Sequence, residues 1–337
     1  MVSVNPATPA TLLAPWMAAQ LRELLTQRGH AWLLSGPSGL GQYELGLALV
    51  RAWLCEQPSD QGACGHCTSC HAIEVHAHAD LCMLMPETVM LELGWPLSEK
   101  AQDEIDSKKR KPSKEIRIEA IRDALEFAQR TSARGRGKAV LVFPAERMNV
   151  YSANALLKTL EEPVGEVRFV LATEAAHQLL PTIRSRCQLH QMVWPKTQQA
   201  MDWLQQQGLS TECARVALRA AGARAQDALA FADLAATWHL LPQAVKRGDI
   251  AVFKDWSALQ TIDALQKLCH DMMAVSCGAS PRFFAPTDLP RSPAWTAMND
   301  WSKALAASRR TAEHPFQAGL MLEALVSQAQ LALNSAA

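Results

Sequence analysis

The pattern of apolar and polar positions divides the chain into two parts. In the first part, short continuous apolar runs alternate with segments of helical periodicity. The apolar runs lie at 31–35, 139–143 and 167–172, and the helical segments lie at 11–28, 42–55 and 117–130. Continuous apolar runs of this length are typical of strands buried on both faces. Their alternation with helices predicts a mostly parallel sheet covered by helices on both sides.

A further helix lies between the second and third apolar runs. Its apolar stripe follows the spacing i, i+3, i+4, i+7 and consists of Ala153, Leu156, Leu157 and Leu160. We expect Ser152 to cap its N-terminus and Pro163 to end it, because serine accepts amide hydrogens at a helix start and proline cannot continue a helix.

The second part begins near residue 195, where strand-like runs stop and alanine-rich helical patterns take over. The sequence therefore predicts three domains: an α/β core at 1–194, a small helical domain at 195–236 and an all-helical domain at 237–337. At 337 residues the chain is too long for one ordinary core, which agrees with this division.

Charge and composition limit the classes of protein to which this chain can belong. The formal net charge is zero, which argues against a protein that coats nucleic acid by bulk electrostatics. No apolar run approaches 18 residues, and the first residues, Met1 to Pro6, lack a basic stretch followed by an apolar one. A cytoplasmic protein is the simplest interpretation.

The first apolar run is followed by an altered phosphate-binding loop. Gly36, Gly39 and Gly41 lie in the loop, and the spacing of Gly36 and Gly41 fits the pattern G-x-x-x-x-G-K-[ST]. Gln42 replaces the lysine that reaches the phosphates, and Tyr43 replaces the hydroxyl residue that holds Mg²⁺. The loop therefore lacks the lysine charge that helps the backbone N–H groups of such loops bind phosphate. We therefore expect a nucleotide-binding fold that does not hydrolyse ATP itself.

The second motif of such ATPases is also altered. Acidic residues normally end the neighbouring strand, hold Mg²⁺ and position water. Here Phe143 and Pro144 occupy those positions, and Glu146 comes two residues late. The sequence thus predicts that no working magnesium site exists.

Four of the nine cysteines are clustered at Cys55, Cys64, Cys67 and Cys70. An odd, scattered total argues against a disulfide framework. Four thiolates can surround Zn²⁺ tetrahedrally, and such a closed site is structural and not catalytic. An iron–sulfur cluster and unrelated buried cysteines are the alternatives.

Two other groups of residues are open to more than one interpretation. A histidine could replace one cysteine as a ligand, although local hydrogen bonding is the simpler role; the candidates are His66, His71, His76 and His78. The basic groups at 108–111 and 134–138 can contact phosphates, but such groups are usually solvated loops.

Four features together resemble the clamp-loader branch of the AAA+ superfamily. They are the segment from Ser152 to Pro163, the strand from Arg168 to Thr173, the triplet Ser185-Arg186-Cys187 and the cysteine insertion after the loop helix. The resemblance covers roughly residues 10–235, whereas the charged insertion at 98–114 has no counterpart in it.

The resemblance implies an AAA+ core with a zinc module, a helical lid and a helical collar that assembles with other subunits. It places the zinc ligands at Cys55, Cys64, Cys67 and Cys70, a sensor at Thr173 and an arginine finger at Arg186. ATP-binding members of the family carry a lid arginine where this chain has Gln226, which is a third departure from an active ATP site.

The implied function is that of a clamp-loader subunit in the DNA polymerase III holoenzyme, and not of an enzyme by itself. The chain would bind structural Zn²⁺ but no ATP, and would act as a rigid stator whose Arg186 serves the ATP of a neighbour. The implied partners are ATP-binding subunits of gamma and tau type and the delta subunit, with the sliding clamp and primer–template DNA reached through the complex. The alternatives are an AAA+ ATPase active in its own right and a zinc-dependent DNA-binding module.

Overall fold

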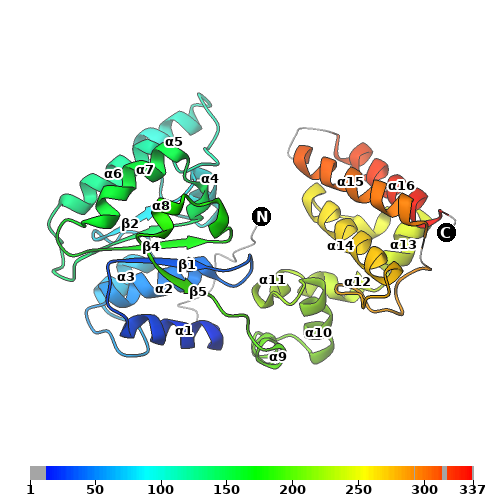
Figure 1. The fold of residues 1–337 in the computed structure, drawn as a ribbon, viewed down its shortest axis with the longest axis horizontal. Helices are drawn as coiled ribbons and strands as arrows, with labels where there is room; N and C mark the ends of the chain where they lie inside the picture. The colour runs from blue at the N-terminus through cyan, green and yellow to red at the C-terminus, as the bar shows by residue number, and fades with distance from the viewer. Residues whose placement is uncertain (1–12, 292, 313–316, 336–337) are drawn as a thin grey trace. The chain divides into compact units, whose positions relative to one another are not determined.

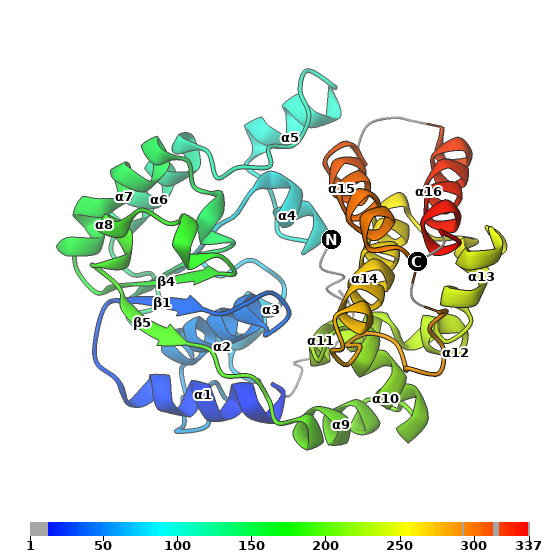
Figure 2. The same cartoon turned by 45° about the vertical axis from the view of Figure 1, so that its right-hand side comes forward.

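The computed structural model describes residues 13–291, 293–312 and 317–335 and divides the chain into two compact units, Met1–Gln199 and Ala200–Ala337 (Figure 1). The first unit is an α/β structure, and the second unit is helical. Figure 2 shows the same elements from a second direction.

The first unit is built on a five-stranded sheet in the order β2-β3-β4-β1-β5, and all four strand pairs are parallel. The strands are β1 (Ala31–Ser35), β2 (Leu81–Leu84), β3 (Lys138–Val142), β4 (Val167–Thr173) and β5 (Gln188–Gln191). The predicted parallel sheet is confirmed. The apolar runs found β1, β3 and β4 but missed the two edge strands, β2 and β5, which are only four residues long.

Helices cover both faces of this sheet, as the sequence predicted. One face packs on α1 (Pro15–Thr26) and α2 (Gln42–Leu54), and the other packs on α6 (Ile118–Gln129) and α7 (Val150–Glu161). Successive strand side chains point to opposite faces. In β1, Trp32 and Leu34 therefore join the α1–α2 cluster while Leu33 joins the α6–α7 cluster. Of the helix expected over 11–28, residues 11 and 12 lie outside the described part of the chain.

The N-terminus of α7 differs from the prediction. Asn149 caps the helix, because its side chain accepts the backbone N–H of Ser152 at 2.9 Å. Ser152 lies inside the helix, fully buried, and its hydroxyl donates to the backbone oxygen of Ile116 at 2.9 Å. Both residue types cap helices well. Ser152 does not cap this helix, because its hydroxyl bonds to the backbone oxygen of Ile116.

The charged insertion at 98–114 contains a helix, α5 (Glu99–Asp106), whose N-cap is Ser98. Arg110 of the adjoining basic run pairs with Glu104 at 2.7 Å and with Glu87, the first residue of α4 (Glu87–Glu92), at 2.5 Å. These two carboxylates anchor the insertion. They also commit the Arg110 guanidinium to this chain, which leaves only the lysines of the run for any phosphate.

Two short helices complete the first unit, α3 (Thr68–Glu74) and α8 (Pro181–Arg184). From residue 197 onward the described elements are helical, as the sequence predicted. The helices are α9 (Thr197–Gln206), α10 (Thr211–Ala220), α11 (Ala225–Ala230), α12 (Ala235–Trp238), α13 (Leu241–Arg247), α14 (Ala258–Ser276), α15 (Trp295–Thr311) and α16 (Ala318–Leu333). The core of the second unit surrounds α14, where Leu265 and Leu268 are fully buried. No helix among the described residues has the length and apolar character needed to cross a bilayer.

Candidate functional site

The altered phosphate-binding loop lies between the carboxyl end of β1 and the start of α2. Gly39 and Gly41 have φ values of 85° and 86°, a region that glycine enters without steric cost. Gly41 directly precedes α2, so the helix N-terminus points into the loop. The sequence thus keeps the backbone path that cradles phosphate in working sites.

Gln42 fills the inside of this loop. Its side-chain amide donates to the backbone oxygens of Gly36 and Pro37, both at 2.8 Å, and the residue is 2% exposed. Leu40 and Met192 pack beside it: a Cβ built on Gly36 would lie 3.0 Å from Leu40 Cδ1 and 3.1 Å from Met192 Cβ. The space that a lysine would cross toward a phosphate thus holds a neutral amide and apolar side chains.

Tyr43 is also committed to the protein interior. Its hydroxyl oxygen accepts the indole N–H of Trp95 at 2.8 Å, and its ring lies 5.5 Å from that of Phe143. Burial raises the pKa of Tyr43 to about 12. The hydroxyl is therefore neutral and already bonded, unlike the small hydroxyl that holds Mg²⁺ in a working loop. Sequence reasoning did not find Trp95, because it lies in a loop 52 residues away.

The structure brings together two residues of the altered site, Glu146 and Thr173. The Thr173 hydroxyl donates to Glu146 Oε2 at 2.6 Å, and the backbone N–H of Glu174 donates to Glu146 Oε1 at 3.3 Å. Thr173 is fully buried at the end of β4. The late acidic residue is thus used to bind the expected sensor threonine, with both carboxylate oxygens engaged.

Arg186 lies at the other end of the sheet. It precedes β5, whereas the loop follows β1, and β5 runs parallel beside β1. The two features are separated by at least the length of β5, about 13 Å for four residues. Arg186 Nη1 donates to the backbone oxygen of Thr182, and Nη2 donates to Glu161 Oε1, each at 3.0 Å. The structure does not bring Arg186 to the loop of its own chain.

Gln226, the third departure, lies half-buried in α11 of the second unit. The preceding Arg224 forms an ion pair with Asp227 at 2.8 Å and bonds to the backbone oxygen of Ala221. The Arg224 guanidinium is therefore engaged by residues next to the start of α11.

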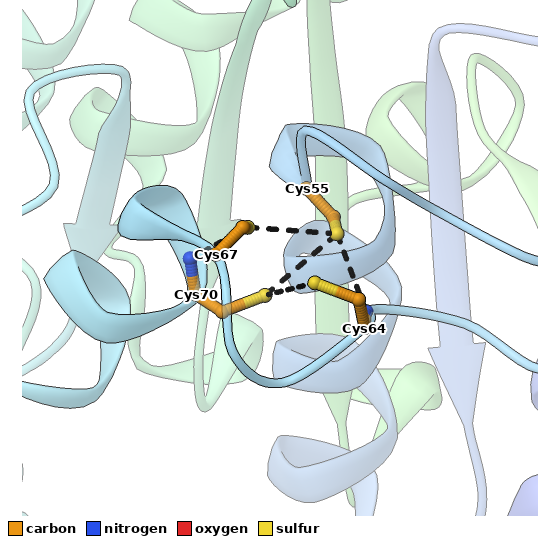
Figure 3. A group of neighbouring side chains, drawn as sticks. All are labelled: Cys55, Cys64, Cys67 and Cys70. Carbon is orange, nitrogen blue, oxygen red and sulfur yellow. Dashed lines mark hydrogen bonds between the residues drawn. The ribbon is translucent and has the colours of Figure 1, made fainter.

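The four clustered cysteines converge on one point. Cys55 ends α2, Cys64 lies in the following loop, and Cys67 and Cys70 come from the start of α3 (Figure 3). All four sulfurs lie within 4.8 Å of one another, with Cys55–Cys70 at 3.7 Å, Cys55–Cys67 at 3.8 Å and Cys64–Cys70 at 4.0 Å.

This arrangement fits a tetrahedral metal ion. With metal–sulfur bonds of about 2.3 Å, the sulfurs of a tetrahedron lie about 3.8 Å apart. Burial, with a further contribution from the bond to Cys67, raises the pKa of Cys70 to about 12. A cation would therefore be needed to hold this sulfur as a thiolate at neutral pH. The donor set of four sulfurs is compatible with zinc.

The nearby histidines have other roles. The four cysteines form the one group of possible metal ligands found among the described residues. His66 bonds to the backbone oxygen of Cys64 at 2.9 Å, and His76 stacks on Trp95 with a ring separation of 3.9 Å. His76 also bonds to the backbone oxygen of Gly94 at 2.8 Å, so local hydrogen bonding, the simpler role predicted from the sequence, is confirmed for His66 and His76.

Comparison with known proteins gives the family. Residues 17–195 match the family model described as DNA polymerase III, delta subunit. The chain is 35% identical over 192 residues to DNA polymerase III subunit delta' of Pseudomonas aeruginosa, an alignment that covers 56% of this chain and 52% of that protein. It is 31% identical over 277 residues to subunit delta' of Escherichia coli, which covers 75% of this chain and 76% of that protein. The chain thus spans about half the length of the Pseudomonas relative and three quarters of the Escherichia relative.

Among solved structures, a DNA polymerase III gamma subunit-related protein from Thermotoga maritima aligns with a TM-score of 0.47 and 17% identity, over 93% of this chain and 98% of that one. The family assignment does not depend on this likeness. It follows from the family model, which matches more than half of the chain, and from the sequence relatives. This chain belongs to the delta prime subunit family of bacterial DNA polymerase III.

Proposed function

We propose that this chain is a clamp-loader subunit of DNA polymerase III that does not hydrolyse ATP and that lends Arg186 to the ATP site of a neighbouring subunit. One observation carries the proposal: the filled loop and the Arg186 guanidinium lie at opposite ends of the same sheet. Because the Arg186 guanidinium does not reach its own loop, a nucleotide on which it acts must be held by another chain.

The chemistry of phosphoryl transfer supports such a role. Negative charge spreads over the γ-phosphate oxygens in the transition state, and a planar guanidinium can bridge two of them. An arginine finger typically raises the rate by about 10³ to 10⁵. Arg186 is suited to this task because its side chain is 27% exposed, so part of the guanidinium faces solvent.

The altered phosphate-binding loop of this chain, by contrast, is suited to staying rigid. The bonds of Gln42 to Gly36 and Pro37 and the Trp95–Tyr43 bond hold the loop without any ligand. A subunit that does not change with nucleotide can act as the stator against which ATP-driven subunits move. Its neighbours would be ATP-binding subunits of gamma and tau type and the delta subunit, acting in the cytoplasm on the sliding clamp and primer–template DNA.

We assign residues 195–236 to a lid and residues 237–337 to a collar that joins the other subunits. We also assign Zn²⁺ to the four cysteines, as a structural ion that fixes the insertion between α2 and α3. This assignment rests on the sulfur separations and on the closed set of four ligands, which leaves no position for a substrate.

Two measurements on the intact chain test the proposal. In the first, the chain is mixed with gamma-type and delta subunits and separated by size; we expect a stable complex with gamma-type subunits next to this chain. In the second, MgATP is titrated into the chain alone. We expect no saturable binding at millimolar ATP and the same result for Gln42→Ala. Magnesium-dependent binding by the wild-type chain would favour an independent ATPase and contradict the stator role.

A further inference from the structure

A pocket of about 640 Å³ lies on the α1–α2 side of the sheet, and neither the altered loop nor Arg186 is among its lining residues. Its walls come from α1, the end of α2, the cysteine insertion, residues 135–136 and the start of β4. We call it the arginine pocket, after three of its lining residues, Arg22, Arg136 and Arg168. Its volume lies in the range of small-ligand sites.

Within the described residues, none of the three arginines forms an ion pair with a carboxylate. Arg22 has one long bond, of 3.4 Å, to the side chain of Gln61, and Arg168 lies over the ring of Trp53. Arg134, two residues from Arg136, behaves differently: it bonds to Glu56 at 3.1 Å and to the Thr68 hydroxyl at 2.7 Å. The fold thus pairs Arg134 with a carboxylate, whereas the three arginines of the pocket keep a positive charge that is not paired in this way.

The pocket also contains an aromatic surface. Trp53 is half-buried, its ring stands 4.8 Å from that of Trp32, and the guanidinium carbon of Arg168 lies 5.3 Å from its centroid. Trp32 and the Arg168 guanidinium both contact the Trp53 ring, so the guanidinium over Trp53 is the flat surface on which a nucleic-acid base can stack.

The position of Arg136 is fixed by the backbone on either side. Gly135 and Gly137 have φ values of 68° and 74°, and a Cβ on Gly137 would lie 2.6 Å from the backbone oxygen of Glu166. The start of the same loop is held by Asp80, whose carboxylate accepts the backbone N–H groups of Ala133 and Arg134 at 2.7 and 2.9 Å. The loop thus places Arg136 among the residues that line the pocket.

Two carboxylates, Asp60 and Glu166, share the pocket with the arginines. They would repel an acidic peptide, but they can accept hydrogen bonds from the amino groups of bases, as acidic side chains do from cytosine. The combination of free arginines, a stacking surface and acceptors matches the three parts of a nucleotide: phosphate, base plane and base edge.

We propose that the arginine pocket binds a nucleoside phosphate, with the phosphate on Arg136 and Arg22 and the base against Trp53 and Arg168. This chemistry has two sources, a free mononucleotide or one nucleotide of a single-stranded DNA. The proposal uses neither the Gln42 loop nor Arg186, so it stands or falls independently of the stator role.

The test uses the full chain and a fluorescein-labelled ten-residue deoxycytidine oligonucleotide, followed by fluorescence anisotropy. We expect binding that weakens with salt, with a slope of about 0.7 per contacted phosphate in a plot of log K against log salt. Arg136→Ala should weaken binding about tenfold and lower the slope, because it removes a phosphate contact, whereas Arg168→Ala should weaken binding about tenfold and leave the slope nearly unchanged, because it removes a base contact. Arg122→Ala, an exposed arginine on α6 outside the pocket, should bind as the wild type does. Thermal unfolding of each variant checks that the fold is kept.

Unlabelled competitors distinguish the sources. Displacement by dCMP at a concentration at which inorganic phosphate has no effect would assign the site to a mononucleotide. Displacement by unlabelled oligonucleotide alone would assign it to single-stranded DNA. Three results would overturn the proposal: no binding of the oligonucleotide or dCMP by the wild type, equal binding by the pocket variants, or equal displacement by a ten-residue glutamate peptide.

Discussion

Glu161 Oε1 accepts a hydrogen bond from Nη2 of Arg186 at 3.0 Å, so the last residue of α7 holds the guanidinium that we propose acts on a neighbouring ATP. The Glu161 side chain is 58% exposed, and pairs in such positions typically contribute about 0.2–1 kcal/mol. The contact is strong enough to favour one orientation of Arg186. Nη1 and Nη2 each carry a second hydrogen, so the guanidinium can keep its contacts with Thr182 and Glu161 while it donates to a phosphate.

We therefore predict that Glu161→Gln lowers the ATPase rate of the assembled complex about two- to tenfold. The reason is that an unrestrained arginine must be ordered on reaching the phosphate, at a cost of about 0.5–1.5 kcal/mol. Steady-state ATP hydrolysis in the presence of clamp and primed DNA measures this. Glu162→Gln, a change at the next residue, which is also exposed, is the matched control and should have no effect. Equal rates for Glu161→Gln and the wild type would remove the positioning role of Glu161.

A second prediction concerns the two tyrosines of the chain, Tyr43 and Tyr151. Tyr43 is buried, and its pKa is raised to about 12, whereas Tyr151 is 77% exposed. A spectrophotometric titration of the folded chain should show the tyrosinate absorbance of Tyr43 appearing near pH 12, above the ordinary tyrosine value of about 10. Tyr43→Phe should remove this step, and Tyr151→Phe should leave it in place.

The same shift predicts how stability depends on pH. The unfolded chain ionises both tyrosines near pH 10, but the folded chain keeps Tyr43 neutral until about pH 12. The contribution of Tyr43 is therefore complete below pH 10 and is lost as the pH rises through 12. Urea unfolding at pH 9 and pH 11 should show a larger loss of stability for the wild type than for Tyr43→Phe. An equal loss in both proteins would mean that the Tyr43 hydroxyl is not buried against Trp95.

The sequence predicted the central strands because the apolar runs that became β1, β3 and β4 are local signals of burial on both faces. The altered loop also rests on a local signal, the departure of Gln42 and Tyr43 from a fixed spacing, and its inability to bind ATP stays a prediction. The edge strand β5 gave no such signal: it reads Gln-Leu-His-Gln, and only His190 is buried. An edge strand can have few buried side chains, so its sequence need not contain the apolar run by which a central strand is recognised.

The partners that complete the site depend on contacts distant in the chain. Trp95 reaches Tyr43 across 52 residues, and Glu146 reaches Thr173 across 27. Glu146 was identified as a misplaced acidic residue, but its bond to Thr173 depends on where the ends of β3 and β4 lie relative to each other. The cysteine cluster was predictable because three of its four members lie within seven residues.

The metal site gives a third prediction. Elemental analysis of the purified chain should find about one zinc per chain, and Cys67→Ser should lose it. Treatment with a strong chelator should lower the melting temperature of the wild type but not that of Cys67→Ser, since a structural metal stabilises only the folded state. Cys213→Ser, a change outside the cluster, is the control and should keep the zinc. Iron in place of zinc, or no metal at all, would contradict the assignment.

The most direct test of the account is single-turnover ATP hydrolysis in a complex where only the subunit next to Arg186 keeps a working phosphate-binding loop. We predict that Arg186→Ala slows hydrolysis at this site by about 10³ or more while the complex still assembles. Arg184→Ala, an exposed arginine two residues away, should leave the rate unchanged. A rate for Arg186→Ala within twofold of the wild type would contradict the proposal that this chain serves the ATP of its neighbour.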